Sequence, residues 1–380
     1  MKIGISAFAA DGGKSGISQY MINVLQRLPQ LDKAVHCVIF VPAKDRALFD
    51  RLLCRCKLVT VPDWVAHPVV SILWHLCMYP LLLRLHQCDC AYLPAGNRRL
   101  GWWYGVPSVS TIHDLSQLHV DGKYDALRMF YIRKVLPAMM QRLTRIVSVS
   151  ESTRRDLIDY TDISPARICV AYNGADLDEF SATEHSAART SIQAFLHTDT
   201  PFILYTARLE HPGKNHVRLL EALALLKQRG KLTHKLVLAG SRWNGAEVID
   251  ATITRLGLTD DVIVTGFVEN SLLPKLYAAA DLFVFPSLFE GFGIPLLEAM
   301  VSGTPVCAAN VASIPEVVGD AALLFDPREP ADIALQVERL LGDNKLRQQL
   351  IARGLQQAQH FSWDDAASGV LQQCYEAVAA

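Results

Sequence analysis

Short apolar runs bounded by turn residues recur along the whole chain, and helical stretches separate them. This alternation is typical of a parallel β-sheet, because two parallel strands can be joined only through a long crossover connection, usually a helix. The runs form a series of seven and a series of six: 2–8, 36–41, 57–61, 90–94, 107–112, 145–150 and 168–174, then 202–207, 235–240, 262–267, 282–287, 305–310 and 322–327. We therefore predict an α/β protein with two doubly wound parallel sheets.

Residues 181–200 separate the two series and hold no strand signal, so we place a linker there. The chain has 380 residues, and a single hydrophobic core rarely serves more than about 250–300. We predict Rossmann-like domains over 1–185 and 186–362 and a final helix over 363–380. Open α/β sheets bind ligands beyond the carboxyl ends of their strands, so a cleft between the two domains is the expected ligand site.

The composition fits a globular chain and argues against some partners. The chain is 51% hydrophobic and 20% charged, with a formal net charge of −1. With no net positive charge and no RNP or helix-turn-helix signature, we expect no nucleic acid partner. Residues 1–180 carry 21 Lys and Arg against 16 Asp and Glu. This excess fits an anionic partner such as a membrane leaflet, and it equally fits solvated helix faces rich in arginine.

Three features bear on location and metal binding. The stretch 64–83 is the most apolar, and it approaches the ~20 residues that span a bilayer. Histidines and prolines interrupt it at His67, Pro68, His75 and Pro80, so we interpret it as a buried helix. The nine cysteines and the opening MKIGISAF favour a reducing compartment, the cytoplasm, and no signal peptide. HQCDC at 86–90 lacks a second ligand pair, so we expect no metal site.

The stretch FEGFGIPLLEAM (289–300) sets Glu290 on a loop and Glu298 one turn into the helix that follows. Pro295 suits the first turn of that helix, where its missing N–H would be unpaired anyway. The Gly291-Phe292-Gly293 turn then presents backbone N–H groups at a helix N-terminus, which suits phosphate or sugar hydroxyls. Both carboxylates can accept hydrogen bonds from the diols of a nucleotide sugar. On the motif alone, a purely structural role for both glutamates stays open.

A second loop, YTARLEHPGKNH, puts Arg208 and Lys214 just after the first strand of the second series. Two cations at a strand end suit a pyrophosphate, although each alone is more often a surface charge. In the first series, the glycine-rich loop up to Gly16 lets a ligand approach the backbone, but it lacks the P-loop spacing. It also lacks the GxGxxG fingerprint of a nicotinamide enzyme.

His113 follows the fifth apolar run. It is a candidate contact for a hexose hydroxyl or for charge in a transition state. The alternative is a histidine at a strand end whose hydrogen bonds are satisfied within the protein.

Together these residues resemble the retaining group-1 (family 4) glycosyltransferases, which have the GT-B fold. The likeness is strong over about residues 200–330, in Arg208 with Lys214, FVEN, DLFVFPSLFEGFGIPLLEAMVSGTPV and SIPEVVGDAALLFDP, and looser in SGISQY, TIHDLS and SVSESTRRDL. The resemblance implies two Rossmann-like domains facing across a cleft. The N-terminal domain would bind the acceptor, the C-terminal one the nucleotide sugar, and the last helix would cross back onto the first domain.

The resemblance also implies roles for single residues. Arg208 and Lys214 would hold the donor diphosphate, Glu298 the ribose hydroxyls and Glu290 the donor sugar, with His113 near the transferred sugar. The remaining donor-binding positions are Gly16 beneath the phosphates, Gly291, Phe292, Gly293 and Ile294 at the sugar, and Phe267 and Val268 at the nucleobase. The loop between Arg208 and Lys214 is one residue longer than the commonest form.

The implied activity is transfer of a hexose, with retention, from a nucleotide-diphosphate sugar to a glycan or lipid-pyrophosphate-linked acceptor in bacterial polysaccharide or lipopolysaccharide synthesis. The motifs are most similar to bacterial mannosyltransferases, so GDP-mannose is the favoured donor. We expect no cofactor and no metal. A nucleotide-sugar epimerase of the same fold and a non-catalytic sugar-nucleotide sensor are the alternatives.

AGNRRLGWWYGVP (95–107) mixes arginines with aromatic residues, a combination suited to lipid headgroups. The residues concerned are Arg98, Arg99, Trp102, Trp103 and Tyr104. We expect a peripheral contact with anionic membrane at the inner face of the plasma membrane. A packed loop is the alternative.

Overall fold

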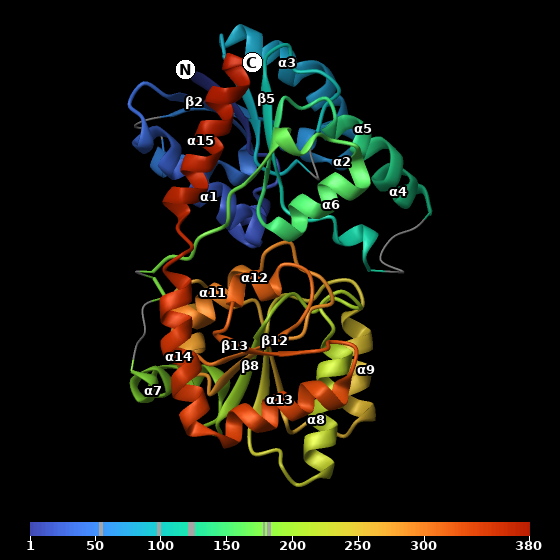
Figure 1. Cartoon of the computed structure of the whole chain (residues 1–380), viewed down its shortest axis with the longest axis vertical. Coiled ribbons are helices and arrows are strands. Elements are labelled where there is room, and N and C mark those ends of the chain that lie inside the picture. Colours follow the sequence, from blue (N-terminus) through green and yellow to red (C-terminus); the bar gives the residue numbers. More distant parts are fainter. Residues whose placement is uncertain (53–55, 97–99, 121–125, 178, 181–183) are drawn as a thin grey trace. The chain divides into compact units, whose positions relative to one another are not determined.

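The computed structural model describes the chain except for residues 53–55, 97–99, 121–125, 178 and 181–183 (Figure 1). The chain forms two compact α/β units. Unit 1 consists of Met1–Leu118, Tyr124–Gly174 and Ser362–Ala380, and unit 2 of His119–Lys123 and Ala175–Phe361. The main boundary thus falls at Gly174, ahead of the predicted position at residue 185, and the last helix belongs to unit 1.

Unit 1 is built on a seven-stranded parallel sheet in the order β3-β2-β1-β4-β5-β6-β7. The strands are β1 (Lys2–Ser6), β2 (His36–Pro42), β3 (Cys56–Val61), β4 (Cys90–Leu93), β5 (Ser108–Ile112), β6 (Arg145–Ser148) and β7 (Ile168–Val170). Helices cover both faces, which explains why the central strands are continuous apolar runs rather than alternating ones. The seven runs of the first series are confirmed as strands.

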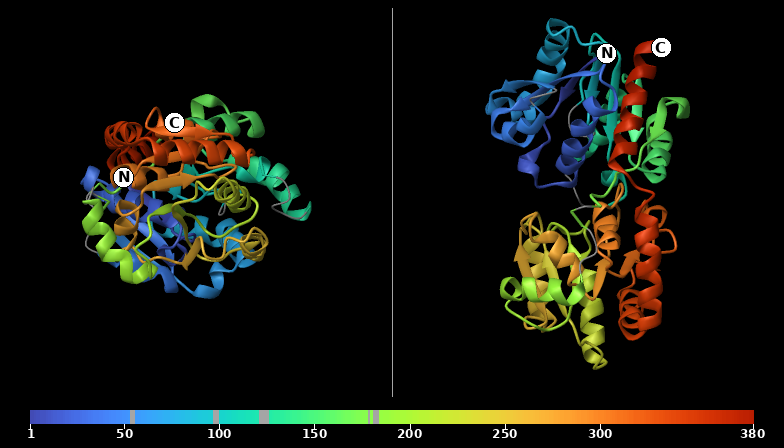
Figure 2. Two further views of the ribbon diagram at one scale, coloured as in Figure 1. Left: turned by 90° about the horizontal axis from the view of Figure 1, so that it is seen from below. Right: turned by 90° about the vertical axis from the view of Figure 1, so that its left-hand side faces the viewer.

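Two helices distant in sequence cover one face of this sheet. α1 (Gly16–Leu31) and α15 (Trp363–Ala379) pack on each other, and α15 also contacts β4, β5 and β6. The right-hand view of Figure 2 shows α15 running along unit 1. Ser362 caps α15 by accepting hydrogen bonds from the backbone N–H groups of Asp364 and Asp365. Arg27 of α1 donates to the Asp364 carboxylate at 2.8 Å, so a charged pair adds to the apolar contact.

The opposite face is covered by α2 (Pro68–Leu73), α3 (Tyr79–Leu85), α5 (Leu136–Met140) and α6 (Glu151–Thr161), which share one hydrophobic core. A π turn (Trp74–Met78) joins α2 to α3, and another (Tyr131–Val135) joins α4 (Ala126–Phe130) to α5. The 3₁₀ segments are Asp11–Gly13, Ala43–Leu52, Asp63–Ala66, Ser116–Leu118 and Pro165–Arg167. In Figure 1, α2 to α5 lie on one side of the sheet, and α1 and α15 lie on the other.

Unit 2 has a six-stranded parallel sheet in the order β10-β9-β8-β11-β12-β13. The strands are β8 (Phe202–Thr206), β9 (Lys235–Ala239), β10 (Val262–Gly266), β11 (Leu282–Phe285), β12 (Val306–Ala309) and β13 (Ala322–Phe325). The helices are α7 (His185–Leu196), α8 (His216–Gln228), α9 (Ala246–Arg255), α10 (Leu273–Ala278), α11 (Ile294–Val301), α12 (Ile314–Val318), α13 (Pro330–Gly342) and α14 (Asn344–Ala358). The six runs of the second series are confirmed as strands.

Three predictions need correction. The linker placed at 181–200 contains α7, whose apolar side chains Ala188, Ile192 and Leu196 are buried at helical spacing. The stretch 64–83 is not one buried helix: it contains α2, the π turn and most of α3, and several of its apolar side chains are exposed. Tyr104, expected at a lipid interface, is buried, and its hydroxyl accepts a hydrogen bond from the Gly101 N–H at 2.8 Å.

Trp102 and Trp103 are exposed, as a lipid interface requires, whereas Arg98 and Arg99 lie outside the described residues. Within the part of the chain that the structure describes, every helix is too short or too polar to cross a bilayer.

Candidate functional site

The loop that follows β8 carries the two predicted cations, and buried hydrogen bonds fix its end. Tyr205 Oη donates to the backbone oxygen of Lys214 at 2.7 Å. The amide of Asn215 donates to the backbone oxygens of Pro286 and Pro327 at 2.9 and 2.7 Å. Asn215 is buried, so it ties the loop to the segments that follow β11 and β13. The cations therefore lie at the carboxyl ends of the strands, where open α/β sheets bind ligands.

Arg208 is held by a carboxylate and an aromatic ring. Its Nη2 donates to Glu210 Oε2 at 3.2 Å, and its guanidinium carbon lies 4.9 Å from the centroid of the Trp243 ring. Backbone hydrogen bonds join the two loops, from Leu209 N to Ser241 O at 2.9 Å and from Trp243 N to Leu209 O at 3.1 Å. The longer loop between Arg208 and Lys214 is thus supported by the loop after β9.

Lys214 contacts the FEGFG motif directly. Its Nζ donates to Glu290 Oε1 at 2.6 Å, and both side chains are partly buried. An ammonium group has three hydrogens to donate, so Lys214 can keep this bond and still donate to a phosphate oxygen. The structure therefore brings together two residues that are 76 positions apart in the chain, with a cation and a carboxylate on one surface.

The glycine turn leads into α11 as predicted. Gly293 precedes the helix with φ of 105°, a left-handed conformation that favours glycine, and Pro295 lies in the first turn. Ser313 is buried, and its hydroxyl oxygen lies 2.8 and 2.9 Å from the backbone oxygens of Glu290 and Phe292, which share its one hydrogen. Ser313 thus fixes the backbone of the turn. The residues Gly291, Phe292, Gly293 and Ile294 form a continuous segment at the start of α11.

Glu298 lies in α11 and is held by a buried tyrosine. Tyr277 Oη donates to Glu298 Oε2 at 2.7 Å, and Thr206 Oγ1 lies 2.6 Å from the same phenol oxygen. Burial raises the pKa of Glu298 to about 7; the hydrogen bond from Tyr277 lowers this pKa, and the nearby Glu179 raises it. The carboxyl group therefore changes its charge near neutral pH, which is unusual for a glutamate.

The predicted nucleobase residues follow β10. Phe267 is exposed and Val268 is buried, so Phe267 presents a ring to solvent while Val268 anchors the segment. Gly240 at the end of β9 donates its N–H to the backbone oxygen of Gly266 at 2.8 Å. A Cβ atom at Gly240 would lie 2.0 Å from the backbone oxygen of Ala207, so only glycine permits this close packing of loops.

Unit 1 contains the other two predicted site residues, His113 and Gly16. His113 directly follows β5, is buried, and has Nε2 at 2.7 Å from the Pro94 backbone oxygen, which accepts this hydrogen bond. Its ring packs edge-to-face on Tyr20, with ring centroids 4.8 Å apart. The Tyr20 hydroxyl in turn lies 2.9 Å from Thr111 Oγ1. The imidazole orientation is therefore fixed, as both the catalytic and the structural interpretations require.

Gly16 is the exposed first residue of α1. The preceding Ser15 forms a reciprocal capping box with Ser18: Ser15 Oγ accepts from the Ser18 N–H, and Ser18 Oγ accepts from the Ser15 N–H at 2.9 Å. Gly12 N–H donates to Asp45 Oδ1 at 3.0 Å, which ties the glycine-rich loop to the segment after β2. A sharply fixed helix N-terminus of this kind can bind an anion.

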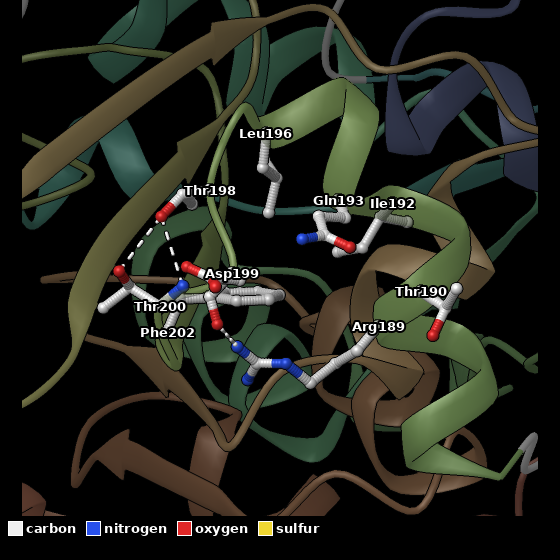
Figure 3. Close-up of a pocket in the computed structure, with 9 residues that line it drawn as sticks. All are labelled: Arg189, Thr190, Ile192, Gln193, Leu196, Thr198, Asp199, Thr200 and Phe202. Atoms are coloured by element: carbon white, nitrogen blue, oxygen red, sulfur yellow. Dashed lines mark hydrogen bonds between the residues drawn. The ribbon is translucent and has the colours of Figure 1, made fainter.

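A separate cavity of about 210 Å³ lies between α7 and the segment that leads into β8 (Figure 3). Arg189 and Phe202 are among its lining residues, and Arg189 donates to the Asp199 backbone oxygen at 2.6 Å. Phe202 is the first residue of β8, so the cavity lies at the amino end of that strand. None of the predicted site residues lines it.

Sequence reasoning missed four partners of the site: Glu210, Trp243, Tyr277 and Ser313. Trp243, Tyr277 and Ser313 each act on a residue far away in the chain or on a backbone group, which no local motif reveals. Glu210 lies only two residues from Arg208, so its contact is local. Among the described residues, no group of three or more His, Cys, Asp or Glu side chains could hold a metal ion.

The two parallel-sheet units and the residues of this site agree with the class of protein that comparison with known families identifies. The family model described as Glycosyl transferases group 1 matches residues 188–357, and that of Glycosyltransferase Family 4 matches residues 14–179. The O-antigen chain mannosyltransferase B of Escherichia coli is 33% identical over 261 residues, which are 69% of this chain and 68% of that protein. The chain therefore belongs to the group 1 glycosyltransferases.

A second relative is the serotype-specific mannosyltransferase WbdA of Escherichia coli, 35% identical over 266 residues, which are 68% of this chain but only 32% of WbdA. Among known structures, Anabaena Alr3699/HepE in complex with UDP and glucose matches with a TM-score of 0.76 at 21% identity over 100% of both chains. WaaG, a glycosyltransferase involved in lipopolysaccharide biosynthesis, matches with a TM-score of 0.70 at 14% identity over 98% of this chain and 99% of that one. These structures show the GT-B fold.

Proposed function

We propose that the protein transfers mannose from GDP-mannose to a glycan or lipid-pyrophosphate-linked acceptor in the synthesis of a bacterial surface polysaccharide. The observation that carries the proposal is the contact between Lys214 and Glu290, with Arg208 on the same loop. This arrangement offers cations for a diphosphate beside a carboxylate for a sugar. The preference for mannose comes from the relatives, whose names describe mannosyltransferases.

In the proposed complex, Arg208 and Lys214 bind the diphosphate, and Glu298 accepts hydrogen bonds from the ribose diol. Glu290 and the segment from Gly291 to Ile294 bind the mannose. The ring of Phe267 and the backbone at Val268 border the nucleobase, since both follow β10 at the carboxyl edge of the sheet. In unit 1, Gly16 would contact the diphosphate and His113 the transferred sugar.

The proposed reaction retains the anomeric configuration by front-face displacement. The bond from the anomeric carbon to the diphosphate oxygen breaks, and the acceptor oxygen bonds to the same face of that carbon. The departing phosphate oxygen takes the proton of the acceptor hydroxyl. Arg208 and Lys214 stabilise the charge that develops on the diphosphate. Since these cations neutralise the leaving group, we propose that neither a metal nor a cofactor is required.

The acceptor and the location are part of the same proposal. A saccharide on a lipid pyrophosphate would be met at the inner face of the plasma membrane, so we place the protein in the cytoplasm, in peripheral contact with that surface. The excess of basic residues over 1–180 supports an anionic surface there.

The test is a thermal-shift panel of GDP-, UDP-, ADP- and dTDP-sugars, followed by an assay for release of nucleoside diphosphate. Ligand at 100 times its Kd stabilises by about 2.7 kcal/mol. We expect a shift with GDP-mannose that Arg208→Ala loses and that the surface control Arg255→Ala keeps. An equal shift in Arg208→Ala would contradict the assigned site.

The same experiment separates the alternatives. If a nucleotide sugar binds but no nucleoside diphosphate is released in the presence of any acceptor extract, a sensor is favoured. Conversion of the free nucleotide sugar to an epimer would favour an epimerase. A shift with a UDP-sugar alone would keep the transferase and reject GDP-mannose.

A further inference from the structure

The helical segment from α2 to α3 exposes an apolar surface on unit 1. The exposed fraction of large hydrophobic side chains there is 58% for Leu73, 64% for Leu81 and 75% for Leu85, values that a packed core never shows. Trp64, in the 3₁₀ segment just before α2, is 69% exposed. Scattered exposed leucines are normal on a protein surface, but a contiguous set marks an interaction site.

The exposed residues form one continuous stripe. Val69, Ile72 and Leu73 precede the π turn, Met78 is the last residue of that turn, and Leu81 and Leu85 follow it. Ile72 and Leu73 come three and four positions after Val69, and the steps from Met78 to Leu81 and on to Leu85 are three and four, as on one face of a helix. A π turn holds more residues per turn than an α-helix. Leu73 and Met78 are five residues apart, which corresponds to about one turn of the π segment Trp74–Met78. The exposed residues before and after this turn therefore face the same side. The residues between them, such as Trp74 and Tyr79, are buried in the core of unit 1.

The tryptophans of the 95–107 loop adjoin this stripe. A Cβ atom at Gly101 would lie 2.8 Å from the backbone oxygen of His75 in the π turn, so the loop packs directly on the helical segment. Tyr104 anchors it, with its ring 6.2 Å from that of Tyr79. Trp102 and Trp103 are exposed beside this anchor.

The charged side chains of α2, α3 and α4 are all basic. The exposed Asp63 and Asp89 border the α2–α3 segment and accept hydrogen bonds from the backbone N–H groups of Lys44 and Lys2. Among the Lys, Arg, Asp and Glu residues, Arg84 is the only one in the sequence from 64 to 88. The neighbouring α4 and its π turn add Arg128, Arg133 and Lys134, all exposed, beside the exposed ring of Phe130. Tyr131 of that turn packs against the same core as Tyr104. Residues 126–140 contain no Asp or Glu.

We propose that this surface, defined by the exposed side chains of α2, α3, the 100–105 loop and α4, docks the protein on an anionic lipid bilayer. Leucine and tryptophan side chains insert at the headgroup boundary, and the basic side chains bind lipid phosphates. A bilayer fits better than a protein partner because α2, α3, the 100–105 loop and α4 carry no acidic residue. Their apolar side chains suit the acyl chains at the headgroup boundary, and their basic side chains suit the anionic headgroups. The proposal rests on the peripheral membrane contact of the proposed function and names the surface that makes it. Vesicle binding needs no donor, acceptor or transfer reaction, so its failure is distinguishable from a failure of the transferase assignment.

The experiment is co-sedimentation of the full chain with vesicles of phosphatidylethanolamine and phosphatidylglycerol, and with vesicles of phosphatidylcholine alone. We expect binding to the anionic vesicles, and at least about a ten-fold lower partition coefficient for the double variant Leu73→Gln/Leu81→Gln. The matched control is Leu335→Gln/Leu355→Gln, which changes two exposed leucines of unit 2 and should bind like the wild type. Arg133→Glu/Lys134→Glu should lose the preference for anionic lipid.

A thermal melt of each variant establishes that it is folded. Absence of wild-type binding to anionic vesicles overturns the proposal, as does unchanged binding by the folded Leu73→Gln/Leu81→Gln variant. If the wild type is instead a dimer that this variant converts to a monomer, and neither binds vesicles, the surface joins two copies of the chain and the bilayer is the wrong partner.

Discussion

The carboxyl-end loops of unit 2 and the α2–α3 surface of unit 1 are organised in opposite ways. In unit 2 each functional charge already has a partner: Arg208 has Glu210, Lys214 has Glu290, and Glu298 accepts from Tyr277. On the α2–α3 surface of unit 1, large apolar side chains face solvent, and the basic side chains lie at its edge. The difference indicates that the first region is built to hold one ligand in a fixed geometry, and the second to meet a surface without fixed geometry.

The largest effect should come from Lys214→Ala. The substitution removes a cation proposed to stabilise the leaving diphosphate and leaves the partly buried Glu290 unpaired. We expect kcat/KM for transfer to fall by about 10³-fold. Lys214→Arg, which keeps the charge, should recover part of the activity. A folded Lys214→Ala protein with activity near that of the wild type would show that the charged pairs of unit 2 are structural.

A smaller effect is expected from Tyr277→Phe, which removes only the hydroxyl that holds Glu298. The KM for the donor should rise about five- to ten-fold, because the carboxylate is no longer positioned. Loss of this hydrogen bond also raises the pKa of Glu298 above about 7.

Since the ionised carboxylate is the better acceptor, donor binding weakens as the pH falls through that pKa. In Tyr277→Phe the weakening should therefore begin at a higher pH. A pH profile of the donor KM checks this, and an unshifted profile would mean that Tyr277 is merely a core residue.

Trp243→Ala tests the ring over Arg208. A cation–π contact at a partly exposed site contributes about 0.5–1 kcal/mol, so we expect a two- to five-fold loss in kcat/KM. Trp243→Phe should be closer to the wild type. An equal loss in both variants would assign the role to the indole edge or to the loop, and not to the aromatic face.

The last effect concerns the stability of the ligand-free protein and leaves the transfer reaction aside. The pKa of Glu298 in the folded protein is about 7, above its usual 4.5, so the folded state binds this proton more tightly than the unfolded state does. The stability contributed by the protonated group is present below pH 4.5 and is lost as the pH rises to about 7. Glu298→Gln cannot ionise.

Relative to the wild type, the ligand-free Glu298→Gln protein should thus gain about 2–3 kcal/mol of unfolding free energy between pH 5 and pH 8. Urea melts at the two pH values measure the gain. An identical difference at both values would contradict the raised pKa.

The strands were predictable from the sequence because each is a short apolar run buried on both faces, a pattern that depends on the strand alone. The glycine turn before α11 was predictable because it also depends only on neighbouring residues, namely Gly291, Gly293 and Pro295. The partners Tyr277 and Trp243 were not, since their contacts depend on which loops the sheet order brings together. The exposure of α2 and α3 was not predictable either, because an apolar sequence does not reveal whether its outer face is covered by other elements or exposed to solvent.

The position of α15 has a consequence for the order of synthesis. Its apolar face, including Trp363, Val370 and Cys374, is buried against the sheet of unit 1, yet its residues leave the ribosome after all of unit 2. All residues of unit 2 are therefore synthesised before unit 1 is complete. One face of the unit 1 sheet stays uncovered until α15 has been translated. In the growing chain the first unit to begin is therefore the last to be finished.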